Sequence, residues 1–334
     1  MKAIDMHAHV LVPELEALVE GHPLRAAELT QQAREMGHAS VAQHLSLMPT
    51  YLPKLTDLGV RLRDMNASDI AMQALSISPT QYYYWADPVL GAKIVATANQ
   101  HLGALARACP DRFVALGTVC LQHPELAVAQ LSDAIHQHGL VGVEISTRAG
   151  ELELSDPALE PFFARAAELS ALIFVHPLGC TLSERLSSHY LSNVIGQPLE
   201  TTIALSKLIF SGVFDRHPQL KLCAAHGGGY LPFYIGRSDH AYLVRPECRT
   251  TLHKPSEYLR AVYYDSLVYS PLALRHLIDQ VGAQRVVLGT DYPFDMGVQS
   301  PLAMLHDVPS LTEREHAQIA GGNAAQILGC GGRA

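Results

Sequence analysis

The feature that most restricts the fold of this chain is an alternation between short apolar segments and longer helix-like segments. Residues 124–139 and 156–170 show the amphipathic pattern of helices, and the second begins with Asp156-Pro157, a typical helix start. Apolar strands that alternate with helices are typical of a parallel sheet covered by helices. Eight such segments over about 290 residues predict a (β/α)₈ TIM barrel. The predicted strands are 3–10, 69–78, 112–120, 139–146, 172–177, 220–228, 261–269 and 285–293.

The spacing of these segments is uneven. Residues 11–68 are too long for one crossover, so we expect a small helical insertion after the first strand, which could form part of a lid. The alternative, a doubly wound open sheet, usually carries a glycine-rich phosphate loop after its first strand, and "MHAHV" is not such a loop. We therefore interpret residues 1–334 as one barrel domain.

Composition narrows the function classes. The net charge is −8 and no block of Lys and Arg occurs, which argues against a nucleic-acid partner. No apolar run approaches the roughly 18 residues that span a bilayer, and no signal-peptide pattern opens the chain. The six cysteines are scattered, as is typical of reduced thiols. A cytoplasmic protein without nucleic-acid or membrane partners is the expectation.

Five polar residues follow or end the predicted strands. His7 and His9 lie two positions apart on the first strand, so both side chains project from one face. His176, His226 and Asp291 end the fifth, sixth and eighth strands. The C-terminal ends of barrel strands open onto one mouth, where these residues converge. Three imidazoles and a carboxylate suit Zn²⁺ or a similar divalent ion with one position open for water.

Each of these residues also has an ordinary structural interpretation. Most of the eighteen histidines, His136 and His217 among them, are expected to be surface or hydrogen-bonded residues. Asp291 alone could cap a helix or pair with Arg285. The joint occurrence of His-x-His, His, His and Asp at four strand ends is what favours a metal site.

The stretches "IDMHAHV", "GVFDRHPQLKLCAAHGGGYLPFYIGR", "YYDSLVYSP" and "VVLGTDYPFDMG" resemble the amidohydrolase superfamily. More narrowly, they resemble its branch of 2-amino-3-carboxymuconate-6-semialdehyde decarboxylase and related non-oxidative decarboxylases. The resemblance implies a distorted (β/α)₈ barrel with one Zn²⁺ bound by His7, His9, His176 and Asp291. It also implies that His226 is a general base beside the metal water. In the hydrolytic alternative given below, Asp291 would also be catalytic, because it would shuttle the proton.

Members of this branch are often dimers, so the resemblance implies a homodimer. Arg237 matches an arginine that reaches a substrate carboxylate across the subunit boundary in the muconate-semialdehyde decarboxylases. A second carboxylate-binding arginine of those enzymes is replaced here by Met48, in "LSLMPTYLPK". Arg61 and Arg63 lie nearby in sequence, but they fall at the start of the helix before strand two. The substrate is therefore expected to differ from the muconate semialdehyde.

Aromatic and glycine residues complete the candidate site. Tyr82 and Trp85, in "TQYYYWADP", follow strand two and could stack on a planar substrate or pack a lid onto the barrel. Phe294, in the same "GTDYPF" stretch as Asp291, is a further candidate for substrate contact. The glycines at 227–229 are expected to allow a sharp turn near the metal. Asp265 and Ser266 could orient a ligand from behind.

Three functions remain open from the residues. The first is non-oxidative decarboxylation of a small aromatic or unsaturated carboxylic acid, and the resemblance favours it. The second is hydrolysis of a lactone, ester or amide, or hydration of an unsaturated acid, because metal hydroxide serves these reactions as well. The third is a binding protein on a decayed barrel, which the presence of all five mouth residues argues against.

Overall fold

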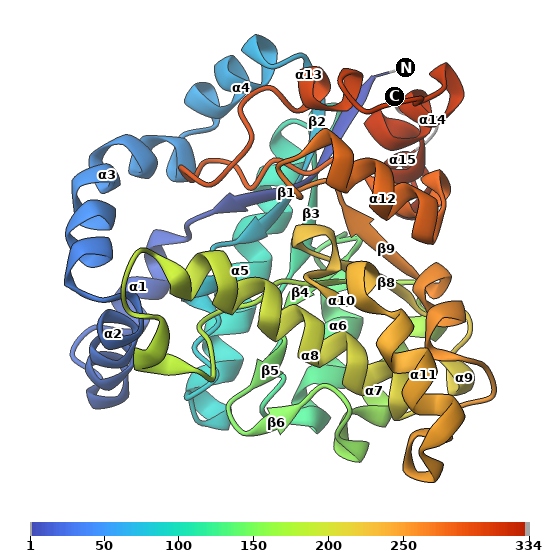
Figure 1. The fold of residues 1–334 in the computed structure, drawn as a ribbon. Coiled ribbons are helices and arrows are strands. Elements are labelled where there is room, and N and C mark those ends of the chain that lie inside the picture. The colour runs from blue at the N-terminus through green and yellow to red at the C-terminus, as the bar shows by residue number, and fades with distance from the viewer. Residues whose placement is uncertain (1, 331–334) are drawn as a thin grey trace.

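A ring of eight parallel strands forms the centre of the protein in the computed structural model, which describes residues 2–330 (Figure 1). The strands pair in chain order, so each neighbour is reached by one crossover. The predicted (β/α)₈ fold is confirmed. The strands are β1 (Ala3–Val10), β2 (Ile70–Ile77), β3 (Phe113–Gly117), β4 (Gly142–Ile145), β7 (Leu172–Val175), β8 (Lys221–Ala224), β9 (Val262–Asp265) and β10 (Val286–Val287), with a separate antiparallel pair, β5 (Arg148–Ala149) and β6 (Leu152–Glu153).

Helices surround this ring, and many of them begin with proline in the first turn. They are α1 (Pro13–Val19), α2 (Pro23–Met36), α3 (His38–Thr56), α4 (Leu58–Ala67), α5 (Pro88–Ala108), α6 (Pro124–His136), α7 (Glu160–Glu168), α8 (Gln197–Phe210), α9 (Val213–Arg216), α10 (Leu231–Tyr234), α11 (Gly236–Val244), α12 (Pro271–Val281), α13 (Pro301–His306), α14 (Glu313–Ala317) and α15 (Asn323–Ile327). None of the helices within residues 2–330 is both long and apolar enough to cross a membrane.

The predicted insertion after the first strand consists of helices α1 to α4, drawn in blue at the left of Figure 1. Helix α3 contacts β1, and α4 contacts β2, so the insertion packs against the first two strands. Arg61 fixes α4 in place: it is 1% exposed, and its guanidinium donates to the backbone oxygens of His9 and Lys54. Arg61 therefore points into the base of the insertion rather than toward a ligand.

The seam between the last and first strands closes the barrel. Strand β10 has only two residues, and the chain continues past it with hydrogen bonds to β1. The Met6 amide donates to the Leu288 oxygen at 2.8 Å, and the Asp291 amide donates to the His7 oxygen at 2.9 Å. An isolated parallel bridge joins Ala8 to Tyr292. The backbone around His7 and Asp291 is thus itself part of the barrel closure.

Strand β1 departs from the regular alternation that its sequence predicts. Asp5 pairs with Gln73 and Ala8 pairs with Leu75, so β1 holds one extra residue between the two pairs. Met6 packs in the buried cluster that contains Phe174, and the Phe174 ring lies 5.0 Å from the His7 ring. The prediction that His7 and His9 project together is confirmed.

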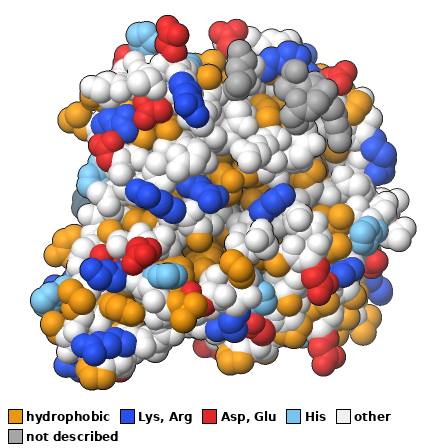
Figure 2. Space-filling model, turned by 90° about the vertical axis from the view of Figure 1, so that its right-hand side faces the viewer, with side chains coloured by type: hydrophobic (Ala, Val, Ile, Leu, Met, Phe, Trp, Pro, Cys, Tyr) orange, Lys and Arg blue, Asp and Glu red, His pale blue; other side chains and the backbone are white. Residues whose placement is uncertain are grey.

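The surface on the right of Figure 1 carries charges of both signs. In Figure 2, which shows that side, Lys and Arg side chains are scattered among Asp, Glu and hydrophobic side chains. The apolar side chains of the strands are instead buried, as in β7, whose four residues are all buried between its neighbours and the helices.

Candidate metal centre

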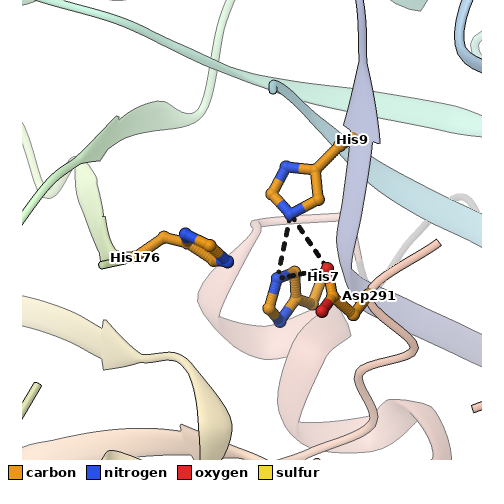
Figure 3. A group of neighbouring side chains, drawn as sticks. All are labelled: His7, His9, His176 and Asp291. Carbon is orange, nitrogen blue, oxygen red and sulfur yellow. Dashed lines mark hydrogen bonds and ion pairs between the residues drawn. The ribbon is translucent and has the colours of Figure 1, made fainter. Parts of the chain in front are cut away.

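Four buried side chains converge at the C-terminal ends of the strands. His7 and His9 lie on β1, His176 directly follows β7, and Asp291 lies in the segment after β10. One ligand atom from each lies within 4.8 Å of the others. In Figure 3 the His7 and His9 rings point toward each other and toward Asp291, and His176 faces the same space. The structure thus brings together the four residues that the sequence analysis proposed as ligands.

The imidazoles of His7 and His9 both direct their Nε2 atom toward this space. Their Nε2 atoms are 3.0 Å apart, and Asp291 Oδ1 lies 3.5 Å from Nε2 of His7 and 3.3 Å from Nε2 of His9. On the other side of each ring, His7 Nδ1 lies 2.7 Å from Asp265 Oδ2, and His9 Nδ1 lies 3.2 Å from the Ile77 oxygen. These acceptors favour the tautomer with the proton on Nδ1.

With both protons on Nδ1, the lone pairs of two Nε2 atoms and a carboxylate oxygen face one another. His176 adds to this set, because neither of its buried ring nitrogens has a hydrogen-bond partner among the described residues. Such an arrangement is repulsive unless a cation lies between the donors. The residues therefore fit a divalent cation, and three imidazoles with one carboxylate are a donor set typical of Zn²⁺.

The electrostatics of the cluster agree with this interpretation. Burial alone would raise the pKa of Asp291, but the neighbouring imidazoles of His7, His226 and His9 hold it well below the usual range. Burial and the neighbouring His7 and His9 lower the pKa of His176 well below its usual value. An ionised carboxylate beside a neutral imidazole is the state that metal ligands require.

His226 lies beside the cluster on a sharp turn after β8. Its Nε2 is 3.8 Å from Asp291 Oδ2, and its ring centroid lies 5.1 Å from that of His176. Its Nδ1 is buried and has no partner among the described residues. The predicted glycine turn is confirmed: Gly227, Gly228 and Gly229 have φ values of +60°, +76° and +66°.

Left-handed backbone recurs around this mouth in residues other than glycine. His226, Tyr269 and Asp291 have φ values of 54°, 57° and 57°, and Tyr190 has 59°. Such conformations are strained for side chains with a Cβ, and they concentrate at functional sites. Their occurrence in residues that surround Asp291 is therefore a second mark of a functional region.

Asp265, at the end of β9, contacts both the candidate ligand His7 and the turn that carries His226. Its Oδ2 binds His7, while its Oδ1 accepts the amide of Gly227 at 2.8 Å. Burial alone would raise the pKa of Asp265, but hydrogen bonding and charge from His7 lower it. The structure therefore places this carboxylate behind a candidate ligand, as the sequence analysis suggested, and also beneath the turn that carries His226. Ser266 instead accepts the amide of Gly289 at 3.2 Å.

Glu144, on β4, is a residue that the sequence analysis missed. It is fully buried and accepts hydrogen bonds from Ser76 Oγ at 2.5 Å and from the Tyr82 hydroxyl at 2.6 Å. Its Oε2 lies 3.8 Å from His9 Nδ1, and burial raises the pKa of its carboxyl group. A single charged residue inside the apolar stretch "GLVGVEIS" was the signal that could have identified it.

The proposed substrate contacts lie in different places. Tyr82 is 5% exposed and directs its hydroxyl to Glu144, behind the cluster. Phe294 lies at the mouth, with its ring 5.7 Å from that of His9. Trp85 lines a separate hollow and packs against His22 at 4.7 Å. This packing agrees with the alternative in which Trp85 packs a lid onto the barrel. A substrate contact by this residue stays a prediction.

Met48 and Arg237 are the two positions that match carboxylate-binding arginines of the muconate-semialdehyde decarboxylases, and both lie in helices. Met48 lies half-buried in α3 of the insertion. Arg237 lies exposed in α11, forms no ion pair with the described residues of its own chain, and does not line the cavity beside His226. Neither position supplies a cation to the centre of this subunit.

A cavity of about 240 Å³ opens beside His226 and Asp291. Its wall is mostly apolar, and the polar side chains in it include Asn193 and Gln197. The principal apolar residues that line it are Tyr230, Phe233, Leu267, Val268 and Met296. A larger open hollow at the other end of the barrel, around Lys2 and Arg112, holds none of the clustered histidines. A small organic ligand therefore fits best beside the histidine cluster.

A parallel barrel with three imidazoles and a carboxylate at its mouth defines a metal-binding class of (β/α)₈ proteins. Residues 4–330 match the family model described as amidohydrolase. The 2-amino-3-carboxymuconate-6-semialdehyde decarboxylase of Dictyostelium discoideum is 32% identical over 98% of this chain and 91% of its own. The solved structure of 5-carboxyvanillate decarboxylase from Sphingomonas paucimobilis has 26% identity and a TM-score of 0.83, and the match covers 98% of this chain and 99% of that one.

A gamma-resorcylate decarboxylase of Rhizobium radiobacter is 25% identical over 82% of this chain and 87% of its own. The chain belongs to the amidohydrolase family, and it is an enzyme of the branch that contains these decarboxylases. The resemblance on which the sequence analysis relied is confirmed.

Proposed function

We propose that the protein is a metal-dependent non-oxidative decarboxylase of a small aromatic or unsaturated carboxylic acid. The observation that carries this proposal is the convergence of four buried ligand atoms beside an apolar cavity that Asp291 and His226 line. The names of the relatives support the reaction class, because they are decarboxylases that match nearly the whole chain.

We assign the ligand role to His7, His9, His176 and Asp291, and we take Zn²⁺ as the ion that this donor set fits best. A bound divalent ion would supply the positive charge that orients the substrate and polarises it. Buried ligands on rigid strand ends hold that charge at a fixed place.

His226 is the proposed proton carrier. In a decarboxylation the bond between the substrate carbon and its carboxylate breaks, CO₂ leaves, and a proton takes its place on that carbon. His226 lines the cavity, and its Nε2 lies 3.8 Å from Asp291 Oδ2. It can therefore hold a proton between the Asp291 carboxylate and a substrate in the cavity. Burial alone would lower the pKa of His226, but the neighbouring carboxylates of Asp291 and Asp265 outweigh this effect and raise it.

The alternative is hydrolysis of a lactone, ester or amide, or hydration of an unsaturated acid. The same four ligands and His226 would serve these reactions. The deciding experiment is an assay of CO₂ release from hydroxybenzoates, aminobenzoates and carboxymuconates, beside a lactone panel. CO₂ from at least one acid, lost in His176→Ala and retained in the surface control His136→Ala, supports the proposal. Lactone turnover without CO₂ from any acid would refute it.

A homodimer is the proposed assembly, with Arg237 acting in the site of the neighbouring subunit. Arg237 is exposed, and three exposed apolar side chains lie on the same two helices, α10 and α11: Tyr234 at 69%, Leu243 at 53% and Val244 at 55%. Exposed apolar side chains around an unpaired arginine are typical of an interface. A cytoplasmic location stays a prediction.

The dimer proposal is tested by mixing two inactive variants, Arg237→Ala and His176→Ala. Random reassortment gives mixed dimers with one intact site, so about a quarter of the wild-type activity should return. A monomer in solution, or no recovery after demonstrated subunit exchange, would show that Arg237 does not act across an interface.

A further inference from the structure

A buried carboxylate lies behind the candidate ligand His9. Glu144, on β4, is fully buried, and its Oε2 lies 3.8 Å from His9 Nδ1. The Nε2 atom of the same ring lies 3.0 Å from Nε2 of His7, in the space of the proposed metal ion. The His9 imidazole therefore stands between that space and the Glu144 carboxylate.

The hydrogen bonds of Glu144 are those of an ionised carboxylate. Ser76 Oγ donates to its Oε2 at 2.5 Å, and the Tyr82 hydroxyl donates to its Oε1 at 2.6 Å. Hydroxyl donors at about 2.5 to 2.7 Å are typical of a charged acceptor. Because Ser76, on β2, is the strand partner of His9 on β1, the bond from Ser76 also fixes Glu144 relative to His9.

The charge of Glu144 has no basic side chain to balance it. Among residues 2–330 its ion-pair partner is His9, and no Lys or Arg bonds to it. Asp265 and Asp291, the two other buried carboxylates of the centre, likewise form ion pairs with histidines alone in the described part of the chain. Buried carboxylates without a cationic partner are strongly unfavourable. The proposed divalent ion is therefore the charge that these three carboxylates share.

Asp265 provides a comparison within the same centre. Its Oδ2 lies 2.7 Å from His7 Nδ1, so a carboxylate stands behind each of the two histidines of β1. A carboxylate behind a ligand imidazole holds the ring in one tautomer and strengthens the bond of its other nitrogen to a metal. For His9, the Ile77 oxygen at 3.2 Å already accepts the Nδ1 proton. The contribution left to Glu144 is therefore its charge.

We propose that Glu144 is a positioning residue for the metal ion: acting through His9, its negative charge strengthens the binding of the ion. Ser76 and Tyr82 hold the carboxylate in place for this role. The proposal rests on the metal centre of the proposed function, but not on the reaction that takes place there.

The test measures the dissociation constant of Zn²⁺ by competition with a chromophoric chelator, with CO₂ release recorded separately. Glu144→Gln keeps the shape of the side chain and removes its charge, so it should weaken Zn²⁺ binding about 10- to 100-fold. The melting temperature of the metal-free variant should not fall, because the change removes a buried charge that has no cation when the ion is absent. A residue that only packs the barrel would show the reverse, a lower melting temperature and an unchanged dissociation constant.

Two further variants separate the charge of Glu144 from its shape. Glu144→Asp fits the site less well but keeps the charge, so it should bind Zn²⁺ more tightly than Glu144→Gln does. Glu200→Gln is the matched control and should keep the wild-type dissociation constant. Glu200 is also a buried carboxylate, and it accepts the amide and the hydroxyl of Thr181, both at 2.6 Å, but within residues 2–330 it bonds to none of the candidate ligands.

Three results would overturn the proposal. The first is an unchanged dissociation constant in Glu144→Gln, and the second is tighter binding by Glu144→Gln than by Glu144→Asp. The third is an equal loss of affinity in Glu200→Gln, since any buried carboxylate would then have the same effect. Weaker Zn²⁺ binding in Glu144→Gln, together with a wild-type enzyme that releases CO₂ from none of the acids, would refute the decarboxylase function and leave the role of Glu144 standing.

Discussion

Replacing Arg61 by methionine should destabilise the protein without removing a substrate contact. The guanidinium is buried in α4 and donates to three acceptors: the backbone oxygens of His9 and Lys54, and Gln73 Oε1. It also lies over the Tyr292 ring, 4.6 Å from the centroid. Methionine keeps most of the length of the side chain, so the change removes the charge and the donors but little of the packing volume.

The expected change in the free energy of unfolding is the difference between two opposing effects. Each of the three acceptors, of which the Lys54 oxygen is only partly buried, costs about 1 to 3 kcal/mol when it is left without a donor, or about 3 to 9 kcal/mol together. Burial lowers the pKa of Arg61 from 12.5 to about 10, so about 3 kcal/mol of unfavourable burial is regained when the charge is removed. The middle of the resulting range is a loss of about 3 kcal/mol. For a chain of this length, that corresponds to a fall of about 4 °C in Tm.

The assay compares Tm and urea midpoint for Arg61→Met and for Arg63→Met, an exposed arginine two residues later on the same helix. Arg63→Met should match the wild type within about 0.5 kcal/mol. Arg61→Lys should lie between the two, because an ammonium group cannot reproduce the fork of the guanidinium.

Two outcomes would refute this reasoning. Equal stability of Arg61→Met and Arg63→Met would show that the three acceptors do not depend on the guanidinium. A large rise in KM for an acidic substrate in Arg61→Met, with unchanged stability, would show that Arg61 reaches the substrate after all.

Three further predictions concern the metal centre and the surface. The double variant His7→Ala/His9→Ala should lose the divalent ion in elemental analysis yet keep its far-UV circular dichroism, because eight strands make the core; full metal occupancy would contradict the ligand assignment. His226→Asn should keep its metal and lose about 10²- to 10⁴-fold in rate, whereas joint loss of metal would make it a ligand. At the surface, hydrogen bonds from Arg216 lower the pKa of Glu160, so their contribution, at most about 1 kcal/mol for this exposed pair, is present above pH 4.5 and lost as the pH falls through the folded-state pKa. Glu160→Gln should therefore lower the urea midpoint more at pH 7 than at pH 3, and an equal effect at both would contradict the ion pair.

The features that depend on a single strand could be predicted from the sequence. Each predicted strand overlaps an observed one, and His176 and Asp291 follow their strands because parallel strands place their C-terminal ends together. The extra residue in β1 could not be predicted, since it exists only relative to the pairing with β2.

The direction in which a long side chain points could not be predicted from the sequence either. Whether Arg61 points to the mouth or into the insertion depends on how α4 packs against β2, and this is a tertiary choice. For Glu144, the charge in an apolar strand marks the residue itself, but it does not reveal the Ser76 and Tyr82 hydroxyls that stabilise it.

The seam of the barrel has a consequence for biosynthesis. Two of the four candidate ligands lie among the first ten residues, and the fourth, Asp291, meets them only when the last strand closes on the first. Thr290 and Asp5, which are hydrogen-bonded across this seam, are 285 residues apart in the chain. A nascent chain on the ribosome therefore has no complete centre until the segment 286–292 has emerged and closed on the first strand. Tight metal binding should begin only after this late step of folding.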